Sequence, residues 1–418
     1  MINTNDPNLK SWVNVPQGSD FPIQNLPYGI FDDGKGARAG VAIGQQILDL
    51  AAVAQKGGFD GIDLDTSVFS SATLNAFMAC GKAIWTAVRE RISTLLQEGS
   101  DFQSHASEVL VAMADAKLLM PVQVGDYTDF YSSIEHATNV GMMFRGKDNA
   151  LMPNWKHLPV GYHGRASSIV VSGTDLHRPK GQTMPPNAEK PVYGPSKRMD
   201  FELEMAFIIG KNTEIGETVS TADAEEHIFG FVLFNDWSAR DLQKWEYVPL
   251  GPFLGKNFGS SISPWIVTLD ALAPFRVASP EQDPAVLPYL QYEGEHNFDV
   301  NLQVAIQPEG EEASTICNSN FKYMYWNICQ QLAHHTVNGC NIQVGDMMAS
   351  GTISGKTPDS YGSMLELSWA GKNDIELEKG GTRKFIEDND TVIMRGYCEK
   401  DGLRIGFGEV SGKILPAK

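Results

Sequence analysis

The pattern of apolar residues changes near Met120-Pro121, and this change constrains the fold more than any other feature of the sequence. Before it, apolar side chains over residues 84–95 recur every three or four residues, as in a helix. After it, short runs typical of β-strands alternate with glycine and proline up to the carboxyl end. The 418 residues also exceed the roughly 250–300 that one core usually holds. We therefore expect two domains, residues 1–118 and 119–418, and a mainly β second domain.

Local signals predict individual elements within these domains. Residues 39–50 predict a hairpin that turns at Gly44-Gln45-Gln46, residues 71–98 a helix that ends at Gly99, and residues 105–118 another short helix. Strands of a large, mostly antiparallel sheet system are predicted at residues 168–172, 205–209, 229–234, 299–306 and 391–394. Residues 177–195 contain five prolines and predict a long surface loop, either a lid or a solvated connector.

Charge and cysteine content exclude several classes of protein. The chain has 33 basic and 51 acidic side chains, so its formal charge is 33 − 51 = −18, which argues against binding to nucleic acid. No segment approaches the roughly 20 apolar residues that span a bilayer, and the amino terminus carries no secretion signal. The five cysteines are scattered without a C-x-x-C pair, so neither a disulfide framework nor a zinc knuckle is expected. We expect a cytoplasmic protein that binds no membrane.

Two glycine-rich segments fail as phosphate-binding loops. Gly351–Thr357 has one residue too few between its glycines, and Pro358 follows at once. Gly251–Asn257 is short in the same way and lacks the hydroxyl residue. Neither can wrap backbone amides around a phosphate, so nucleotide hydrolysis is not expected. The G-x-S-x-G and H-E-x-x-H patterns are also absent from the sequence.

Acidic residues in three stretches form a candidate metal site. Strict alternation over residues 200–207 places Glu202 and Glu204 on one face of a strand, although a solvent-facing polar stripe is the commoner explanation of such a pair. Asp236 ends an apolar strand, and Asp129 lies in an aromatic loop just past the domain boundary. If the four carboxylates converge, a cation must separate them, and ligands that are all oxygen favour Mg²⁺, Ca²⁺ or Mn²⁺ over zinc.

His136 is the candidate general base. It follows Asp129 by seven residues, in a stretch where serines are expected to cap a helix. Alone, such a histidine is more often structural than catalytic. His334 and His335 follow a helical run and are interpreted as packing and cap residues.

Short motifs along the chain carry a resemblance to a known family. They are Pro27–Gly29, Gly125–Ser133, His136–Asn139, Leu158–Arg165, Glu202–Glu204, Asn235–Asp241, Pro249–Lys256 and Ser363–Trp369. From about residue 20 to residue 416, the chain resembles the fumarylacetoacetate hydrolase family. The Glu-x-Glu strand and the later Asp are common to the whole family, which includes acylpyruvases, hydratases and decarboxylases. The Asp-Phe-Tyr-Ser-Ser loop, the His-Ala-Thr-Asn stretch and the long amino-terminal domain resemble those members that hydrolyse fumarylacetoacetate.

The resemblance implies a fold and an activity. The fold is mainly β, with a small amino-terminal SH3-like barrel with helices and a large carboxy-terminal β-sandwich roll through which homodimers form. The activity is hydrolysis of a carbon–carbon bond in 4-fumarylacetoacetate, a small diketo acid. The products are fumarate and acetoacetate, in the last step of tyrosine and phenylalanine catabolism.

The resemblance also assigns roles to residues. The ligands of a Ca²⁺ or Mg²⁺ ion would be Asp129, Glu202, Glu204 and Asp236, and a second Mg²⁺ position would lie near Asp236, Lys256 and Ser260. His136 would be the base, oriented by Glu366. The substrate would contact Tyr131, Arg145, Gln243, Tyr247 and Thr352, and an oxyanion would be stabilised by Arg240, Gln243 and Lys256.

Two other functions stay open at this point. The same fold and metal would serve an acylpyruvase or a related diketo-acid hydrolase, which needs neither Tyr131 nor the full amino-terminal domain. A binding protein that uses the carboxylates for a structural cation would not need His136 opposite a glutamate.

Overall fold

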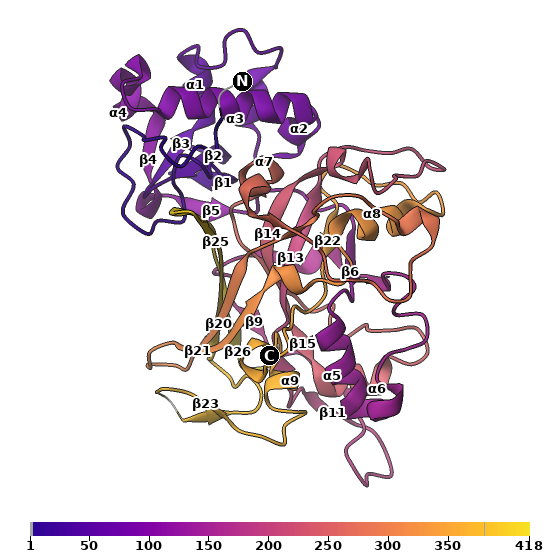
Figure 1. Ribbon diagram of the computed structural model, residues 1–418. Helices are drawn as coiled ribbons and strands as arrows, with labels where there is room; N and C mark the ends of the chain where they lie inside the picture. Colours follow the sequence, from indigo (N-terminus) through magenta and orange to yellow (C-terminus); the bar gives the residue numbers. More distant parts are fainter. Residues whose placement is uncertain (1–2, 380) are drawn as a thin grey trace.

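Residues 28–119 build one curled antiparallel sheet with helices on it. The computed structural model describes residues 3–379 and 381–418. The sheet has the strand order β4-β3-β2-β1-β5, and Figure 1 shows this unit as the indigo and purple part of the chain. Its strands are β1 (Tyr28–Asp32), β2 (Arg38–Ile43), β3 (Gln46–Asp49), β4 (Leu110–Ala112) and β5 (Lys117–Leu119). Its helices are α1 (Leu50–Gln55), α2 (Asn75–Met78), α3 (Lys82–Leu96) and α4 (Ala106–Val109).

The structure confirms the hairpin at residues 39–50 and corrects two helix predictions. The single helix expected over residues 71–98 is two helices, because Gly81 has a φ of +86° that no helix accommodates. The second of them ends at Leu96, before the predicted stop at Gly99. Within residues 105–118, α4 covers only the start and a 3₁₀ helix covers Met113–Asp115, because β4 and β5 take the segments on either side of that turn into the sheet.

The remaining chain is dominated by two packed sheets. The larger has the strand order β7-β6-β22-β13-β14-β16-β8, with β17 paired to β14. Its strands are β6 (Tyr127–Phe130), β7 (Gly161–His163), β8 (Ile169–Val171), β13 (Leu203–Ile209), β14 (Ile228–Asp236), β16 (Ser260–Ile262), β17 (Val267–Thr268) and β22 (Met347–Ala349). The smaller sheet has the order β21-β20-β25-β26-β9. Its strands are β9 (Leu176–His177), β20 (Asn301–Gln307), β21 (Ser314–Asn320), β25 (Thr391–Lys400) and β26 (Leu403–Leu415).

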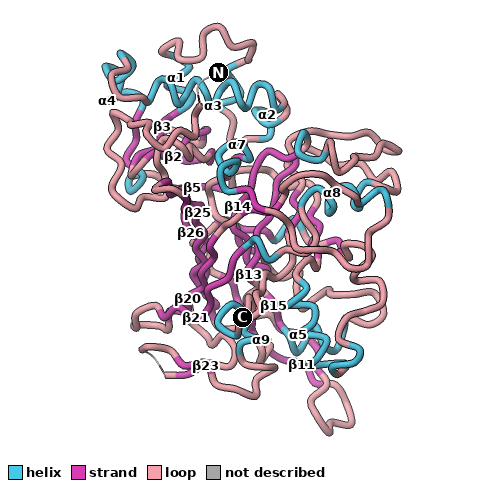
Figure 2. The backbone as a smooth tube through the Cα atoms, viewed as in Figure 1, coloured by secondary structure: helices cyan, strands magenta, loops and turns pink. Residues whose placement is uncertain are grey.

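Short strand pairs and helices complete this part. The pairs are β10 (Lys180–Thr183) with β11 (Val192–Pro195), β12 (Met199–Asp200) with β15 (Ser238–Ala239), β18 (Arg276–Val277) with β19 (Asn297–Phe298), and β23 (Ile375–Glu376) with β24 (Thr382–Arg383). The helices are α5 (Ile134–Arg145), α6 (Arg240–Glu246), α7 (Leu269–Leu272), α8 (Ile328–Thr336) and α9 (Met364–Leu367). Figure 2 shows the strands running through the middle of the molecule with the helices around them.

The predicted strands and the predicted mainly β fold class are confirmed, but the proline-rich loop is not. Residues 180–183 and 192–195 of that segment pair as β10 and β11, so the loop is the tip of a hairpin. The expectation of one long loop is wrong because the prolines at 179, 191 and 195 lie at the edges of a two-stranded ribbon, where their missing N–H groups break no ladder. The division near residue 118 stays a prediction.

The central strand β13 is buried on both faces. Leu203, Met205 and Phe207 point into the core between the two sheets. Ala206 and Ile208 point to the opposite face, where they share a core with the amino-terminal strands and helices. A strand held from both sides has little freedom to shift, and it is the strand that carries the candidate metal ligands.

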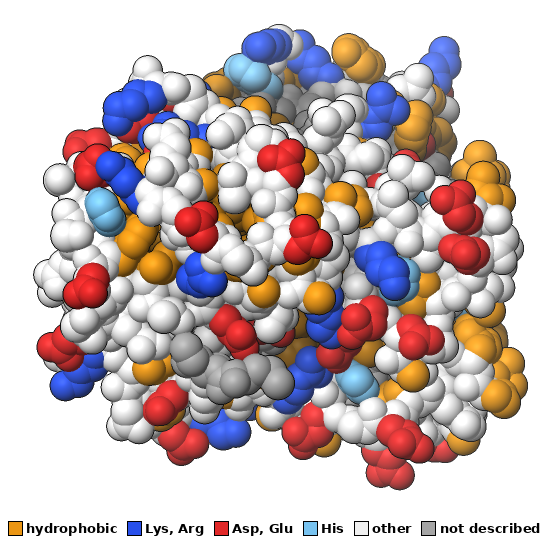
Figure 3. Space-filling model, turned by 90° about the horizontal axis from the view of Figure 1, so that it is seen from above, with side chains coloured by type: hydrophobic (Ala, Val, Ile, Leu, Met, Phe, Trp, Pro, Cys, Tyr) orange, Lys and Arg blue, Asp and Glu red, His pale blue; other side chains and the backbone are white. Residues whose placement is uncertain are grey.

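The length of the helices and the distribution of charge describe the outside of the molecule. Within the described residues, none of the helices has both the length and the apolar character needed to cross a membrane. On the face drawn in Figure 3, acidic and basic side chains are interspersed and form no large area of one charge.

Substitution of Phe229 tests how the amino-terminal unit packs on the large sheet. Its ring is 1% exposed and lies against Tyr28, Phe77 and Trp85 at centroid distances of 5.7, 5.9 and 5.1 Å. We expect Phe229→Ala to lower the free energy of unfolding by about 3–5 kcal/mol, measured by urea denaturation. Tyr193→Ala, at a side chain 74% exposed, should change it by less than about 0.5 kcal/mol. Equal losses for both variants would contradict this packing.

Candidate active site

Four carboxylates on or next to three strands of the large sheet converge on one point. Glu202 directly precedes β13, and the other three lie in β6, β13 and β14. Asp129, Glu202, Glu204 and Asp236 each offer an oxygen, and these oxygens lie within 4.8 Å of one another. All four residues are buried, and Glu202 and Glu204 are only 5% and 0% exposed. The alternative that Glu202 and Glu204 form a solvent-facing polar stripe is therefore wrong. The group could hold a metal ion.

Sheet topology explains why residues so far apart in sequence meet. Asp236 is the last residue of β14, which pairs with β13 so that Glu204 lies opposite Phe234. Asp129 lies in β6 opposite Ala349 of β22, and β22 is the other neighbour of β13. The expectation that Asp129 lies in a loop is wrong, because its segment pairs with β22 and β7 as a buried strand.

Two oxygens of this group have no hydrogen-bond partner among the described residues. They are Oδ1 of Asp129 and Oε1 of Glu204, and both are buried. Burial raises the pKa of Asp129, and the charge of Asp236 raises it further. Burial also raises the pKa of Glu204, and the charge of Asp129 raises it further. Buried acceptors that lack donors and repel each other fit a bound cation, which would supply the missing positive charge.

The other oxygen of Glu204 has a partner that explains the failed phosphate-loop pattern. The backbone N–H of Gly351 donates to Glu204 Oε2 at 2.9 Å. Gly351 has a φ of +77°, and a Cβ there would collide with the backbone of Phe130. The glycine is therefore needed for a close backbone approach to a carboxylate, not to a phosphate.

Glu202 is held by two cations. Nη1 of Arg240 lies 2.7 Å from Oε1, and the Lys256 ammonium contacts Oε2. Burial alone would raise the pKa of Glu202, but the charges of Lys256 and Arg240 outweigh it and hold the pKa below the ordinary range. Glu202 is therefore ionised.

Lys256 and Ser260 surround Asp236. The Lys256 ammonium lies 2.8 Å from Oδ2, and the Ser260 hydroxyl donates to Oδ1 at 2.9 Å. Burial disfavours the charged ammonium, but Asp236 and Glu202 reverse this effect and raise the pKa of Lys256. A protonated ammonium has no lone pair for a metal ion, so its side chain suits oxyanion stabilisation better than the predicted role as a metal ligand.

His136 forms a close polar pair with Glu366. Its Nδ1 lies 2.6 Å from Oε2 of Glu366. The helix that carries it, α5, is capped by Ser133, whose Oγ accepts the backbone N–H of His136, as predicted. The edge of the Tyr131 ring contacts the imidazole at a centroid distance of 5.2 Å.

Glu366 is fixed by several donors. Asn139, Ser354 and Ser363 donate to its oxygens at 2.9, 2.9 and 2.8 Å. Burial alone would raise its pKa, but His136 and these hydrogen bonds lower it. The carboxylate is therefore ionised and rigid, which fixes both the tautomer and the orientation of the imidazole.

These groups border one cavity of about 600 Å³. The predicted residues among its walls are Asp129, Tyr131, His136, Arg145, Glu202, Arg240, Gln243, Tyr247, Lys256 and Thr352. The remaining predicted residues, Glu204, Asp236, Ser260 and Glu366, lie behind these walls and contact them as described above. The Arg240 Nη2 is buried without a partner among the described residues, so a guanidinium that borders the cavity has an unused donor.

The sequence prediction missed several residues of the cavity wall, among them the polar residues Tyr162 and Lys244. Tyr162 lies opposite Asp129 in the β6–β7 pair, and its hydroxyl donates to Asp236 Oδ2 at 3.2 Å. Lys244 follows Arg240 by four residues and precedes Tyr247 by three, so it lies on the same helical face as both. That spacing was the available signal for Lys244.

Asp200 is a further residue that the prediction did not assign. It is fully buried and accepts Nε of Arg240 at 2.7 Å. It also accepts the backbone N–H groups of Met364 and Leu365 at 2.7 and 3.0 Å, at the start of α9. Asp200 therefore joins Arg240 to the helix that carries Glu366.

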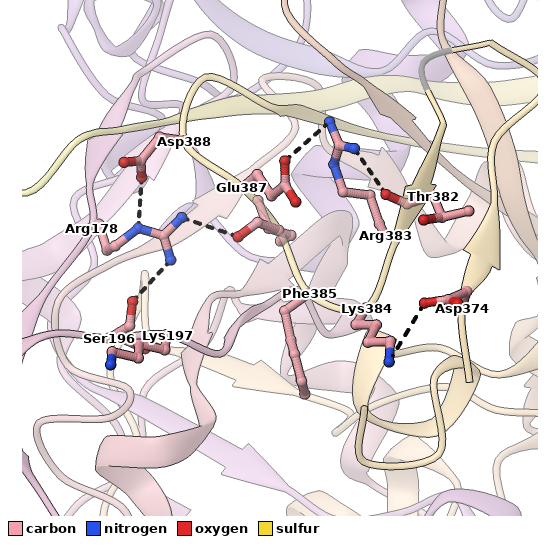
Figure 4. Close-up of a pocket in the computed structure, with 11 residues that line it drawn as sticks. Arg178, Ser196, Lys197, Asp374, Thr382, Arg383, Lys384, Phe385, Glu387 and Asp388 are labelled. Carbon is pink, nitrogen blue, oxygen red and sulfur yellow. Dashed lines mark hydrogen bonds and ion pairs between the residues drawn. The ribbon is translucent and has the colours of Figure 1, made fainter. Parts of the chain in front are cut away.

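A second hollow, of about 580 Å³, has no comparable chemistry (Figure 4). Its charged side chains pair with one another: Arg178 with Asp388 at 2.6 Å, and Lys384 with Asp374 at 3.6 Å. The candidate site is therefore the cavity beside the four carboxylates.

Comparison with known proteins identifies the family. The fumarylacetoacetase N-terminal model matches residues 24–121, and the fumarylacetoacetate (FAA) hydrolase C-terminal model matches residues 127–414. The chain belongs to the fumarylacetoacetate hydrolase family. Together the two models cover most of the chain, and the predicted resemblance is confirmed.

Individual relatives agree with this assignment. The fumarylacetoacetase of Bos taurus is 57% identical over 416 residues, which cover 97% of this chain and 99% of the relative. That of Arabidopsis thaliana is 50% identical over 417 residues, which cover 98% and 99%. The solved fumarylacetoacetate hydrolase of Exiguobacterium antarcticum has a TM-score of 0.55 at 18% identity, covers 94% of this chain and 100% of its own, and shares the fold. The prediction that the chain is an enzyme, a hydrolase, is confirmed.

Glu204→Gln tests whether the cluster is built for a cation. Without metal, the change removes a buried like charge, and we expect the free energy of unfolding to rise by about 1–3 kcal/mol. With metal, it removes a ligand, and we expect Ca²⁺ or Mg²⁺ affinity in isothermal titration calorimetry to fall by at least about 10–100-fold. Glu98→Gln, at an exposed position, should change neither quantity. Unchanged metal affinity in Glu204→Gln would exclude this carboxylate as a ligand.

Proposed function

We propose that the protein hydrolyses the carbon–carbon bond between the two carbonyl groups of 4-fumarylacetoacetate and releases fumarate and acetoacetate. One observation carries the proposal. The imidazole of His136, which Glu366 orients through a hydrogen bond, borders the same cavity as the carboxylate cluster. The relatives named fumarylacetoacetase support the choice of substrate. The step would be the last in tyrosine and phenylalanine catabolism.

Asp129, Glu202, Glu204 and Asp236 are the proposed ligands of a Ca²⁺ or Mg²⁺ ion. The support is the all-oxygen donor set and the two buried oxygens without partners. When bound, such an ion polarises the carbonyl oxygens of a chelating 1,3-diketone. A second Mg²⁺ position near Asp236 and Ser260, with Lys256 beside it, is proposed on the resemblance alone.

His136 is the proposed general base. The Glu366 carboxylate holds Nδ1, so Nε2 is left to take a proton from a water molecule in the cavity. The hydroxide attacks the fumaryl carbonyl carbon, the carbon–carbon bond breaks, and its electron pair leaves with the acetoacetate fragment as an enolate. The enolate recovers a proton from the imidazolium, which restores the neutral base. Glu366 stabilises that imidazolium in a buried setting.

Arg240, Gln243 and Lys256 are the proposed stabilisers of the oxyanion that forms on the attacked carbonyl. The unpartnered Nη2 of Arg240 supports this role, since a buried donor without an acceptor is ready for one. Oε1 of Gln243 accepts a hydrogen bond from Nη1 of the same guanidinium at 3.3 Å, which restricts the position of the guanidinium. Tyr131, Arg145, Gln243, Tyr247 and Thr352 are the proposed substrate contacts, since all of them border the cavity.

The protein is proposed to be a cytoplasmic homodimer with no nucleic-acid or membrane partner. All five cysteines are free thiols, which suits a reducing compartment. The segment Tyr247–Leu254 has several exposed apolar side chains, including Leu250 at 95%, and offers an apolar contact surface. Sedimentation velocity measures the oligomeric state.

A smaller diketo acid such as an acylpyruvate is the second candidate substrate, and a non-catalytic binding protein the third candidate function. The cavity of about 600 Å³ has two cationic residues on its wall, Lys244 and Arg145. These cations favour a substrate with a second carboxylate over an acylpyruvate. The His136–Glu366 pair argues against a binding protein, because a structural cation needs no base.

His136→Ala tests the proposed chemistry. We expect turnover of fumarylacetoacetate to fall by on the order of 10²–10⁴-fold, because general-base catalysis is lost, while thermal unfolding and metal affinity stay normal. Loss of diketone absorbance measures the turnover. His157→Ala, at an exposed histidine away from the cavity wall, should keep full turnover. Near-normal turnover in His136→Ala would remove this residue from the mechanism.

Lys244→Gln separates the two candidate substrates. The ammonium is exposed at the cavity wall and makes no ion pair with any residue that the structure describes, so we propose that it pairs with the second carboxylate of fumarylacetoacetate. We expect KM for this dianion to rise about tenfold, worth about 1.4 kcal/mol, with kcat nearly unchanged. KM for the monoanion acetylpyruvate should hardly change. Equal effects on both substrates would contradict recognition of a second carboxylate.

A further inference from the structure

A second group of metal-ligating side chains lies outside the candidate active site. Glu225 in the short 3₁₀ helix Ala224–Glu226, His296 just before β19, and Cys329 in α8 each offer one atom, and these atoms lie within 4.8 Å of one another. None of the three borders the catalytic cavity. The group brings together one nitrogen, one sulfur and one oxygen donor, a mixed set that the oxygen-only catalytic cluster does not have.

The orientation of His296 points to a ligand at its Nδ1. The other ring nitrogen, Nε2, lies 2.8 Å from the backbone carbonyl oxygen of Glu293, which assigns it the hydrogen. Nδ1 then faces Glu225 Oε1 at 2.8 Å and Cys329 Sγ at 3.4 Å. In the neutral imidazole, a lone pair would face a carboxylate oxygen, so either a second proton or a cation must lie between them. In a histidine that binds a metal ion, the ring nitrogen that does not contact the metal usually donates its hydrogen to an acceptor such as a backbone carbonyl.

Glu225 is held in place independently of His296. Both of its oxygens accept from Arg276, at 2.7 Å each, and the guanidinium lies over the Phe298 ring at 5.0 Å. A carboxylate oxygen has lone pairs for both an arginine and a metal ion. The Arg276 charge weakens the attraction for a cation, whereas the thiolate formed at Cys329 restores it.

The spacing of the donors fits a tetrahedral ion with small adjustments. With zinc bonds of about 2.0–2.1 Å to nitrogen and 2.3 Å to sulfur, tetrahedral geometry separates these two atoms by about 3.5 Å. The observed separation of Nδ1 and Sγ is 3.4 Å. Nδ1 and Oε1 would need to part by roughly half an ångström from their 2.8 Å hydrogen bond.

Access to the group is also suitable. Cys329 is fully buried, whereas the side chains of His296 and Glu225 are 17% and 21% exposed. An ion can therefore enter from the surface and keep a water molecule as its fourth ligand.

We propose that Glu225, His296 and Cys329 form a binding site for a thiophilic divalent ion such as Zn²⁺. Binding replaces the thiol proton of Cys329 and the proton on Nδ1 of His296, both of which leave to solvent, and forms bonds from Sγ, Nδ1 and Oε1 to the ion. The site links α8 to the segment before β19 and to the 3₁₀ helix at Ala224–Glu226. The inference does not depend on the proposed function, since none of these residues takes part in the proposed reaction.

Cobalt(II) titration of the full chain tests the site. The protein is first saturated with Mg²⁺, so that the carboxylate cluster is filled, and Co²⁺ is then added. We expect a thiolate-to-cobalt charge-transfer band in the near ultraviolet that saturates at one equivalent. A cobalt ion bound only by oxygen ligands gives no such band, so the readout is specific for a cysteine site.

Three variants decide the assignment. Cys329→Ser should abolish the band, and His296→Gln, at a partly exposed position, should weaken Co²⁺ binding at least tenfold while the protein stays folded. Cys340→Ser, at a half-buried cysteine outside the group, should keep the full band. Absence of the band in the wild-type protein, or its survival in both Cys329→Ser and His296→Gln, would overturn the proposal. The first of these results would leave His296 as a protonated partner of Glu225 in an ion-pair network with Arg276.

Discussion

Repulsion among four buried carboxylates is the constraint on which the active-site region depends. Their oxygens lie within 4.8 Å of one another, in an interior where like charges interact strongly. The chain meets this constraint in two ways. On one side, Arg240 and Lys256 neutralise Glu202. On the other, oxygens of Asp129 and Glu204 have no protein partner among the described residues, so the remaining charge is left for an ion. A site of this kind is stable only on a rigid support, which β13 provides because both of its faces are buried.

The same constraint links the acidic cluster to the imidazole. Arg240 contacts Glu202 through one nitrogen and Asp200 through another, and Asp200 accepts the first backbone N–H groups of α9. That short helix carries Glu366, which fixes His136. The carboxylate cluster, Arg240 and His136 are therefore members of one polar network, and a shift of any one of them moves the others. Such a network gives preorganisation, since the groups are aligned before a substrate arrives.

Ligand chemistry separates the two groups of candidate metal ligands. The carboxylate cluster offers only oxygen and suits hard ions, whereas the group around Cys329 offers nitrogen, sulfur and oxygen and suits softer ones. The first is buried beside the cavity, and the second lies at the start of α8, where His296 and Glu225 are partly exposed. The two groups therefore differ in donor type as well as in access.

The sequence by itself determined the local features: the strands with alternating or continuous apolar runs, the capped helix at His136, the Glu-x-Glu strand, and the family through its motifs. It predicted a loop at Asp129, because pairing of β6 with the distant β22 leaves no mark on the local pattern. It also predicted one long loop at residues 177–195, because the prolines there hid a two-stranded hairpin. Convergence of the carboxylates, the pairing of His136 with Glu366, and the role of Asp200 were decided by the tertiary structure. The group of Glu225, His296 and Cys329 was invisible for the same reason, since its members are 71 and 33 residues apart. Contacts between remote segments depend on sheet order and register, which only the folded chain specifies.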